Sequence, residues 1–173
     1  MSDAQSTAEG VLKELLAQAV TPVLKGAGFK KTKTTYHRRH GQTVQVVNVQ
    51  SSHGSTWSEK KFYVNVGIAF DAICELSGET ILERPKEHEC DDRGTRGRLE
   101  QLVAGAPASW TLLVGEDIAG TIVALHDCMV RLKVELDRID GLAAYRSHRW
   151  FDRFRPAALR AQILYLLGDA DAA

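Results

Sequence analysis

Residues 61–70 have the sequence KFYVNVGIAF, in which an apolar side chain occurs at every second position. Because successive side chains of a β-strand point to opposite faces, this alternation predicts a strand with one apolar face. We expect that face to be buried as one continuous row on a sheet. The row consists of Phe62, Val64, Val66, Ile68 and Phe70.

Two further strands are predicted before it. Residues 42–52, QTVQVVNVQSS, are rich in β-branched side chains and apolar on both faces, which favours a central strand. Only a short connection separates them from residues 61–70, so we expect the two strands to pair antiparallel. Residues 29–39, FKKTKTTYHRR, are rich in threonine and charge and predict one exposed strand.

Helices are predicted at both ends of the chain. Apolar positions between Val11 and Leu24 fall on one helical face, and Pro22 predicts a kink, with Thr21 as the cap of a new turn. A last helix is expected from Pro156 to Leu167.

The longest predicted helix follows Gly115 and carries an apolar stripe with alternating spacings of four and three residues. The stripe consists of Ile118, Ile122, Leu125, Met129, Leu132, Leu136 and Ile139. A second apolar set is expected to widen the buried face, so that the helix packs on a sheet within its own domain. This set consists of Ala119, Val123, Val130 and Val134. The alternative is that the stripe forms a dimeric coiled coil.

The middle of the chain is less regular. Residues 71–82 predict a short helix or loop, residues 83–97 predict irregular structure, and residues 98–103 and 109–114 each predict a late strand. The fold class is therefore α+β: an antiparallel sheet of about four to six strands, an N-terminal helix and a C-terminal helical layer on one sheet face. With no linker or repeat in the sequence, we expect one domain over residues 1–173.

Composition indicates a cytoplasmic protein. The 22 basic and 22 acidic residues cancel, whereas a dedicated nucleic-acid binder is usually basic. No apolar run approaches the roughly 20 residues of a membrane span, and the first ten residues lack the pattern of a signal peptide. Three widely spaced cysteines predict free thiols, with Cys128 buried and Cys90 the most reactive, in a polar loop. The sequence HEC at 88–90 lacks the paired spacing of a zinc site, so we expect no metal and no cofactor.

Charged and amide side chains supply the candidate binding residues. Six basic residues and no acidic one lie between Lys25 and His40. On a single strand, Lys31 and Lys33 would share one face, and Lys30 would lie on the other with Tyr36; a lysine-rich strand of this kind suits a sheet edge. Amides lie on the two strands that are expected to pair, where the simplest interpretation is a structural hydrogen bond across them. The full candidate set is Lys30, Lys31, Lys33, Tyr36, Arg38, Arg39, Asn48, Gln50 and Asn65.

A family resemblance rests on motifs spread over residues 10–100. The first is a Leu-Lys-x-x-Gly-Phe segment, followed by strands that contain Asn-x-Gln-x-Ser and Phe-x-x-Asn-x-Gly and then by a loop with a cysteine and an arginine. The matching residues are Leu24, Lys25, Gly28, Phe29, Asn48, Gln50, Ser52, Phe62, Asn65, Gly67, Cys90 and Arg98. In these features the chain resembles the family named domain of unknown function 4304. The resemblance implies a bacterial cytosolic domain and no particular reaction, cofactor or ligand.

Three hypotheses for function follow. The first is a binding protein that acts through protein–protein contact, immunity-like or regulatory, because the charge is unevenly distributed and no catalytic motif is present. The second is a nucleic-acid or nucleotide-binding module that uses the basic strand with Phe29 and Tyr36. The third is an enzyme with a polar pocket on the sheet, built around Asn48, Gln50, Asn65, His53 and Cys90. We expect a protein partner, no membrane, and a monomer or weak homodimer.

Overall fold

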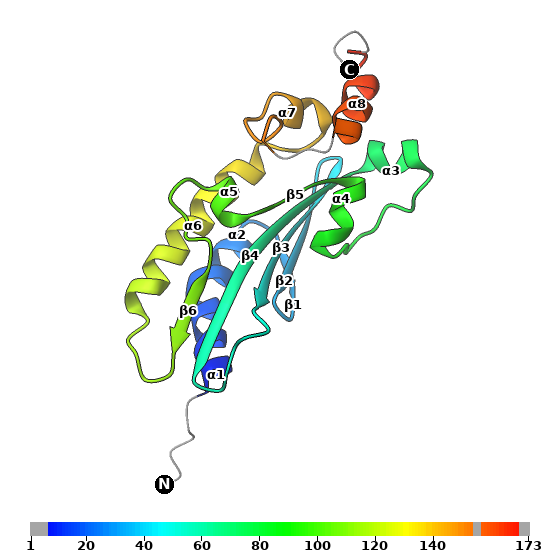
Figure 1. The fold of residues 1–173 in the computed structure, drawn as a ribbon. Coiled ribbons are helices and arrows are strands. Elements are labelled where there is room, and N and C mark those ends of the chain that lie inside the picture. Colours follow the sequence, from blue (N-terminus) through cyan, green and yellow to red (C-terminus); the bar gives the residue numbers. More distant parts are fainter. Residues whose placement is uncertain (1–6, 154–156, 170–173) are drawn as a thin grey trace.

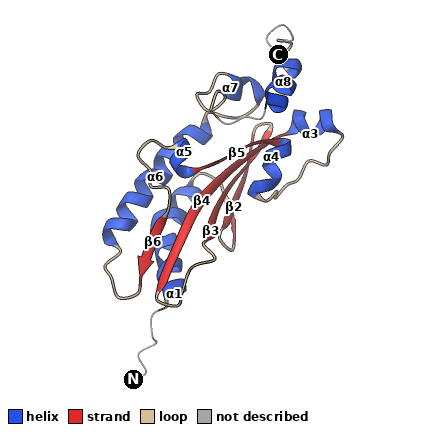
Figure 2. Cartoon of the chain, viewed as in Figure 1, coloured by secondary structure: helices blue, strands red, loops and turns tan. Residues whose placement is uncertain are grey.

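A computed structural model describes residues 7–153 and 157–169, and its centre is a six-stranded antiparallel sheet (Figures 1 and 2). The first five strands lie side by side in chain order, and the sixth pairs with the same edge of β4 as β5 does. The strands are β1 (Lys30–Thr32), β2 (Thr35–His40), β3 (Thr43–Ser51), β4 (Glu59–Phe70), β5 (Gly94–Arg98) and β6 (Trp110–Leu113). The α+β class with an antiparallel sheet and helices at both ends is thus confirmed.

Helices pack on one face of this sheet and at one end of it, and two short helical segments cover part of the other face (Figure 1). The longer ones are α1 (Ala8–Leu15), α6 (Ala119–Asp137) and α8 (Ala157–Leu166). The shorter ones are α2 (Thr21–Gly26), α3 (Asp71–Ser77), α4 (Cys90–Arg93), α5 (Leu99–Leu102) and α7 (Leu142–Arg146), with a π-helical turn η1 (Leu16–Val20) and a 3-10 turn η2 (Glu87–Glu89). Among the residues described, no helix is both long and apolar enough to cross a membrane.

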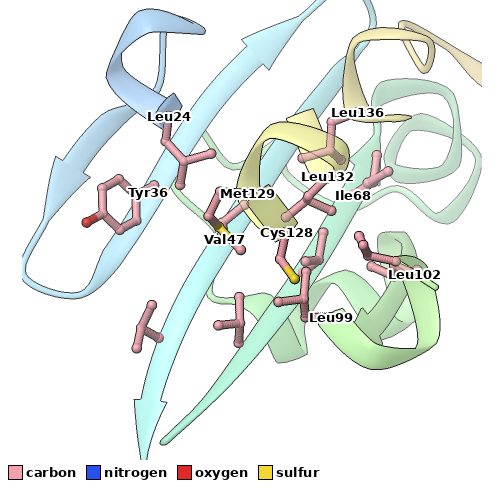
Figure 3. Packing of buried hydrophobic residues seen from close by; sticks show 14 of the residues in the cluster. Leu24, Tyr36, Val47, Ile68, Leu99, Leu102, Cys128, Met129, Leu132 and Leu136 are labelled. Atoms are coloured by element: carbon pink, nitrogen blue, oxygen red, sulfur yellow. The ribbon is translucent and has the colours of Figure 1, made fainter. Parts of the chain in front are cut away.

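The core lies between the sheet and the layer formed by α1, α2 and α6 (Figure 3). The row predicted on β4 is buried throughout, with Phe62 and Val66 0% and 2% exposed. Met129 and Leu132 of α6 are fully buried against it, together with Val47 of β3. The predicted pairing of the two central strands is also confirmed, because β3 and β4 form an antiparallel ladder.

The N-terminal helix is interrupted where Pro22 predicts it. A π-helical turn ends at Val20, and α2 begins at Thr21 with Pro22 in its first turn, where the missing N–H costs no hydrogen bond. Thr21 was expected to cap this turn, which is wrong. Its hydroxyl lies 2.8 Å from the Tyr36 hydroxyl and ties α2 to the sheet.

Two other expectations are corrected. Residues 29–39 form two strands, because Lys33 adopts a left-handed conformation, with φ 56°, in a turn between β1 and β2. The second apolar set on α6 does not widen the buried face: Val123 is 70% exposed and Val134 42%. The first stripe and Cys128 meet the core, with Leu125 fully buried. Pro156 lies outside the described residues, and the last helix is described from Ala157.

The region 83–103 holds the largest error. Residues predicted to be irregular contain η2, α4 and the strand β5, and residues 99–102 are helical instead of extended. Glycines hid the strand, because they usually break strands in a sequence pattern. Here they allow close approach: a Cβ added at Gly94 would lie 1.9 Å from the Ile68 carbonyl oxygen.

Candidate functional site

The two sheet faces differ in chemistry. Because side chains alternate, the residues of β4 between those of the buried row point away from α6. We call the open part of this opposite side the polar face. It consists of Asn48, Gln50, Lys61, Tyr63, Asn65, Arg96 and Arg98.

The neighbouring part of the opposite side is covered by η2 and α4. Cys90 is fully buried and packs with Val46 and Ala69. It approaches the backbone of β4 so closely that a Cβ added at Gly67 would lie 2.7 Å from its sulfur. Gly67 is therefore needed for contact between α4 and the sheet.

Burial of Cys90 overturns its prediction as the most reactive thiol. Burial raises its pKa to about 12, and the nearby carboxylates of Asp91 and Glu87 act in the same direction. Burial also raises the pKa values of Cys74 and Cys128, and Cys128 is buried as predicted. In the described part of the chain, no three His, Cys, Asp or Glu side chains come together as a metal site. Hence these thiols and the HEC sequence at 88–90 supply no activated nucleophile or ligand cluster.

The predicted basic segment is divided by its turn. β1 lies at the sheet edge, as a lysine-rich strand favours, and Lys30, Lys31 and Lys33 are exposed. Lys30 was predicted to share a face of the strand with Tyr36, but the structure places Lys31 there. Lys31 pairs in register with Tyr36, with Nζ 5.5 Å from the ring centroid, whereas Lys30 is opposite His37 on the other side of the sheet. Lys31 and Lys33 line one hollow together with Lys13, whereas Lys30 lies apart from them.

Two members of the candidate set serve the interior. Tyr36 is fully buried, and Arg38 is 9% exposed. The Arg38 guanidinium donates to Asp137, to the carbonyl of Ala27 and to the side chain of Gln45. These contacts hold the hairpin to the end of α6 and leave neither side chain free for a partner.

Arg39 remains exposed and forms an ion pair with Asp71 at 2.7 Å. It lines a hollow of about 380 Å³ between the edge of the sheet and the segment before η2. The hollow is lined by Gly28, Lys30, His37, Arg38, Arg39, Glu83 and Arg84. Because both Arg38 and Arg39 already pair with acids, Lys30 and Arg84 are the cations that this hollow leaves for a ligand among the described residues.

The amide candidates form the hydrogen bonds that their strands predict. Asn48 and Asn65 are direct partners in the register of β3 and β4. Asn48 donates to the Thr35 hydroxyl at 2.8 Å, and Asn65 donates to Gln50 Oε1 at 2.8 Å. The expected hydrogen bond across the two central strands is formed by Asn65 and Gln50, whereas Asn48 bonds to β2 instead. Each bond leaves further polar atoms of Gln50 and Asn65 on the polar face.

The residue that sequence reasoning failed to place is Arg98. It is opposite Asn65 in the register of β4 and β5, and its guanidinium lies 4.6 Å from the Tyr63 ring centroid. No acidic side chain pairs with Arg98 among the described residues. The family motif contained Arg98, but with β5 unrecognised nothing in the pattern put it beside Asn65.

A second hollow, of about 330 Å³, lies beside this arginine. We call it the Arg98 hollow. Its lining consists of Gln50, Asn65, Asp91, Arg96, Gly97, Arg98 and Gln101. The ion pair between Arg96 Nε and Asp91 Oδ1, at 3.2 Å, closes one side. The arrangement is suited to polar recognition, because a cation that lies over an aromatic ring and several amide groups line one space.

The fold is an α+β domain with a helical layer on one side of its sheet and the polar face on part of the other. A family model matches residues 20–143, and the chain belongs to that family, described as Domain of unknown function (DUF4304). Neither a search of curated proteins nor a search of solved structures gave a match. The match of the family model confirms the family resemblance of the sequence motifs.

Proposed function

We propose that the protein is a binding protein that holds an acidic protein partner on its polar face. The observation that supports this most strongly is the position of Arg98, stacked on Tyr63 without an acidic partner in the described chain. Tyrosine and arginine are the side chains enriched at the centres of protein interfaces. The amides around them supply further hydrogen bonds.

The charge of this surface favours an acidic partner. Lys61 lies near the same ring, with Nζ 5.9 Å from the Tyr63 centroid, and adds a second cation to that of Arg98. Arg96 is already paired with Asp91. Complementary charge raises the rate of association and suppresses wrong partners.

The other two hypotheses receive less support. A nucleic-acid surface was expected on the basic segment, but Tyr36 and Arg38 are buried and Arg39 is paired. An enzyme was expected to use a polar pocket around Asn48, Gln50, Asn65, His53 and Cys90. Gln50 and Asn65 line the Arg98 hollow, but the raised pKa of the buried Cys90 makes its thiolate scarce at neutral pH. The cations and amides of the polar face can recognise a protein partner without binding nucleic acid and without catalysis.

The proposal includes a cytoplasmic location in a bacterium and a monomer or weak homodimer, with an immunity-like or regulatory role. Free cysteines suit a reducing compartment. Burial of Leu125 and Met129 within the chain removes the need for a partner helix. Sedimentation over a range of concentrations measures the oligomeric state.

Site-specific photocrosslinking in the native host tests the partner. A crosslinking amino acid at Gln50, on the polar face, is expected to capture one protein. The same amino acid at Val123, on the outer side of α6, is expected not to capture that protein. The purified partner should bind at least about tenfold more weakly after Lys61→Glu with Arg98→Glu, since a tenfold change corresponds to about 1.4 kcal/mol.

The matched control is Lys13→Glu with Lys25→Glu, which makes the same charge change on exposed positions of α1 and α2. It should leave the affinity nearly unchanged. Crosslinks from Gln50 to nucleic acid, or equal losses of affinity in both double variants, would contradict the proposal.

A further inference from the structure

We infer that the Arg98 hollow is a binding site for one carboxylate group. The inference rests on the proposed function only in that the protein partner is expected to supply the carboxylate. It starts from the chemistry of the lining, and not from the identity of the partner.

Arg98 is positioned before a ligand arrives. Its backbone belongs to β5, which pairs with β4 at Asn65, and its backbone N–H donates to Gln101 Oε1 at 2.7 Å. The ring of Tyr63 lies beneath its guanidinium. A cation held in this way loses less conformational entropy on binding than a free lysine does.

Neighbouring hydrogen bonds determine which amide atoms remain for a ligand. Because Gln101 Oε1 accepts from Arg98, the Gln101 NH₂ group is left as a donor. Gln50 Oε1 accepts from Asn65, so the NH₂ group of Gln50 is also left as a donor. The guanidinium and two amide donors thus line one hollow, which suits an acceptor-only ligand.

The charge balance selects a monoanion. Two arginines and one aspartate line the hollow, a net charge of +1, and Arg96 is engaged by Asp91. A carboxylate leaves the hollow neutral and accepts two parallel bonds from a guanidinium. A phosphate dianion would add a charge that no further cation of the lining offsets.

Nuclear magnetic resonance of the full chain tests the site directly. Acetate is titrated at constant ionic strength while the Arg98 Nε–H signal and the NH₂ signals of Gln50 and Gln101 are followed. We expect saturable shifts at all three. Arg98→Gln should abolish saturation, and Gln50→Ala should weaken it severalfold. The control Arg138→Gln, at a 64% exposed side chain, should leave the titration unchanged.

Peptides then distinguish two sources of the carboxylate. One peptide carries a single glutamate and an amidated end, a second carries only a free C-terminal carboxylate, and a third carries neither. We expect either the glutamate peptide or the peptide with a free C-terminus to bind more tightly than acetate. The peptide without a carboxylate should not compete with acetate. Shifts that never saturate, saturation that survives Arg98→Gln, or tighter binding of phosphate than of acetate would each overturn the inference.

These outcomes are separable from those of the crosslinking experiment. A captured protein partner without carboxylate binding refutes the site and leaves the proposed function standing. Saturable carboxylate binding without any captured protein refutes the partner and leaves the site standing.

Discussion

Arg38 of β2 and Asp137 in the last turn of α6 are 99 positions apart in the chain, and their side chains form an ion pair of 2.7 Å. Gln45 of β3 joins them: it accepts from Arg38 and donates to the carbonyls of Leu136 and Ile139. The pair therefore attaches the long helix to the hairpin formed by β2 and β3. A buried charge of this kind is tolerated because the guanidinium donates hydrogen bonds to Asp137, Ala27 and Gln45.

Removal of Asp137 should be costly, because it leaves the Arg38 guanidinium buried without its anion. We expect Asp137→Ala to lower the free energy of unfolding by about 2–3 kcal/mol in urea denaturation. The control Asp127→Ala removes an exposed ion pair with Arg131 on the same helix and should cost less than about 1 kcal/mol. Equal effects of the two variants would show that the Arg38 contact does not stabilise the fold.

This contribution should also depend on pH. Burial acts to raise the pKa of Asp137, but hydrogen bonds from Lys133 and Arg38 outweigh it and lower the pKa below its usual value. The stabilisation is therefore complete above the unfolded-state pKa of about 3.9 and is lost as the pH falls through the folded-state pKa. The difference between wild type and Asp137→Ala should shrink in that acidic range.

His148 should make the protein less stable in mild acid. Burial lowers its pKa, although the Glu135 carboxylate acts in the opposite direction. The geometry suits the neutral ring: Nε2 lies 2.8 Å from Glu135, and Nδ1 accepts the N–H of Trp150 at 3.2 Å, a bond that protonation would abolish.

A base with a lowered folded-state pKa stabilises fully above its unfolded-state pKa, about 6.5 for histidine, and loses that stabilisation as the pH falls toward the folded-state value. We expect the free energy of unfolding to decline below about pH 6.5 and this slope to flatten in His148→Gln. His126→Gln, at an exposed histidine of α6, is the control. An unchanged slope in His148→Gln would refute the assignment.

Two substitutions on α6 distinguish internal packing from a coiled coil. Leu125 is fully buried, so Leu125→Glu should cost several kcal/mol, roughly 3 or more, and unfold much of the population. Val123 is 70% exposed, and Val123→Glu should change stability by less than about 0.5 kcal/mol. Circular dichroism measures whether each variant is folded, and sedimentation measures its oligomeric state. A folded, monomeric Leu125→Glu variant would instead support a dimer seam.

Cys90 should be among the slowest thiols to react. Burial raises its pKa to about 12, so the thiolate is scarce at pH 8, and its side chain is buried against Gly67. A thiol reagent should modify it rapidly only after denaturation. Rapid labelling of one thiol in the native protein, lost in Cys90→Ser, would contradict the packing of α4.

The local alternation and helical spacing of apolar residues predicted much of the framework. The row from Phe62 to Phe70, the central strand at 42–52 and the stripe on α6 all follow from such patterns, because one-sided burial imposes a repeat that neighbouring residues record. Pro22 similarly predicted the interruption of the N-terminal helix, because the missing N–H of proline removes a hydrogen bond within the same helical turn.

Only the tertiary structure decided which polar residues meet. Asn65 and Arg98 lie in strands whose pairing spans α3, η2 and α4, and the glycines that permit β5 to approach β4 resemble strand breakers in the sequence. The turn at Lys33 reversed the expected facing of Lys30 and Lys31, because a shift of one residue exchanges the faces of a strand. Composition made Cys90 look exposed, and the contact with Gly67 buried it. Sequence patterns record the side of an element that faces the core, whereas a binding site depends on long-range register, which no local repeat encodes.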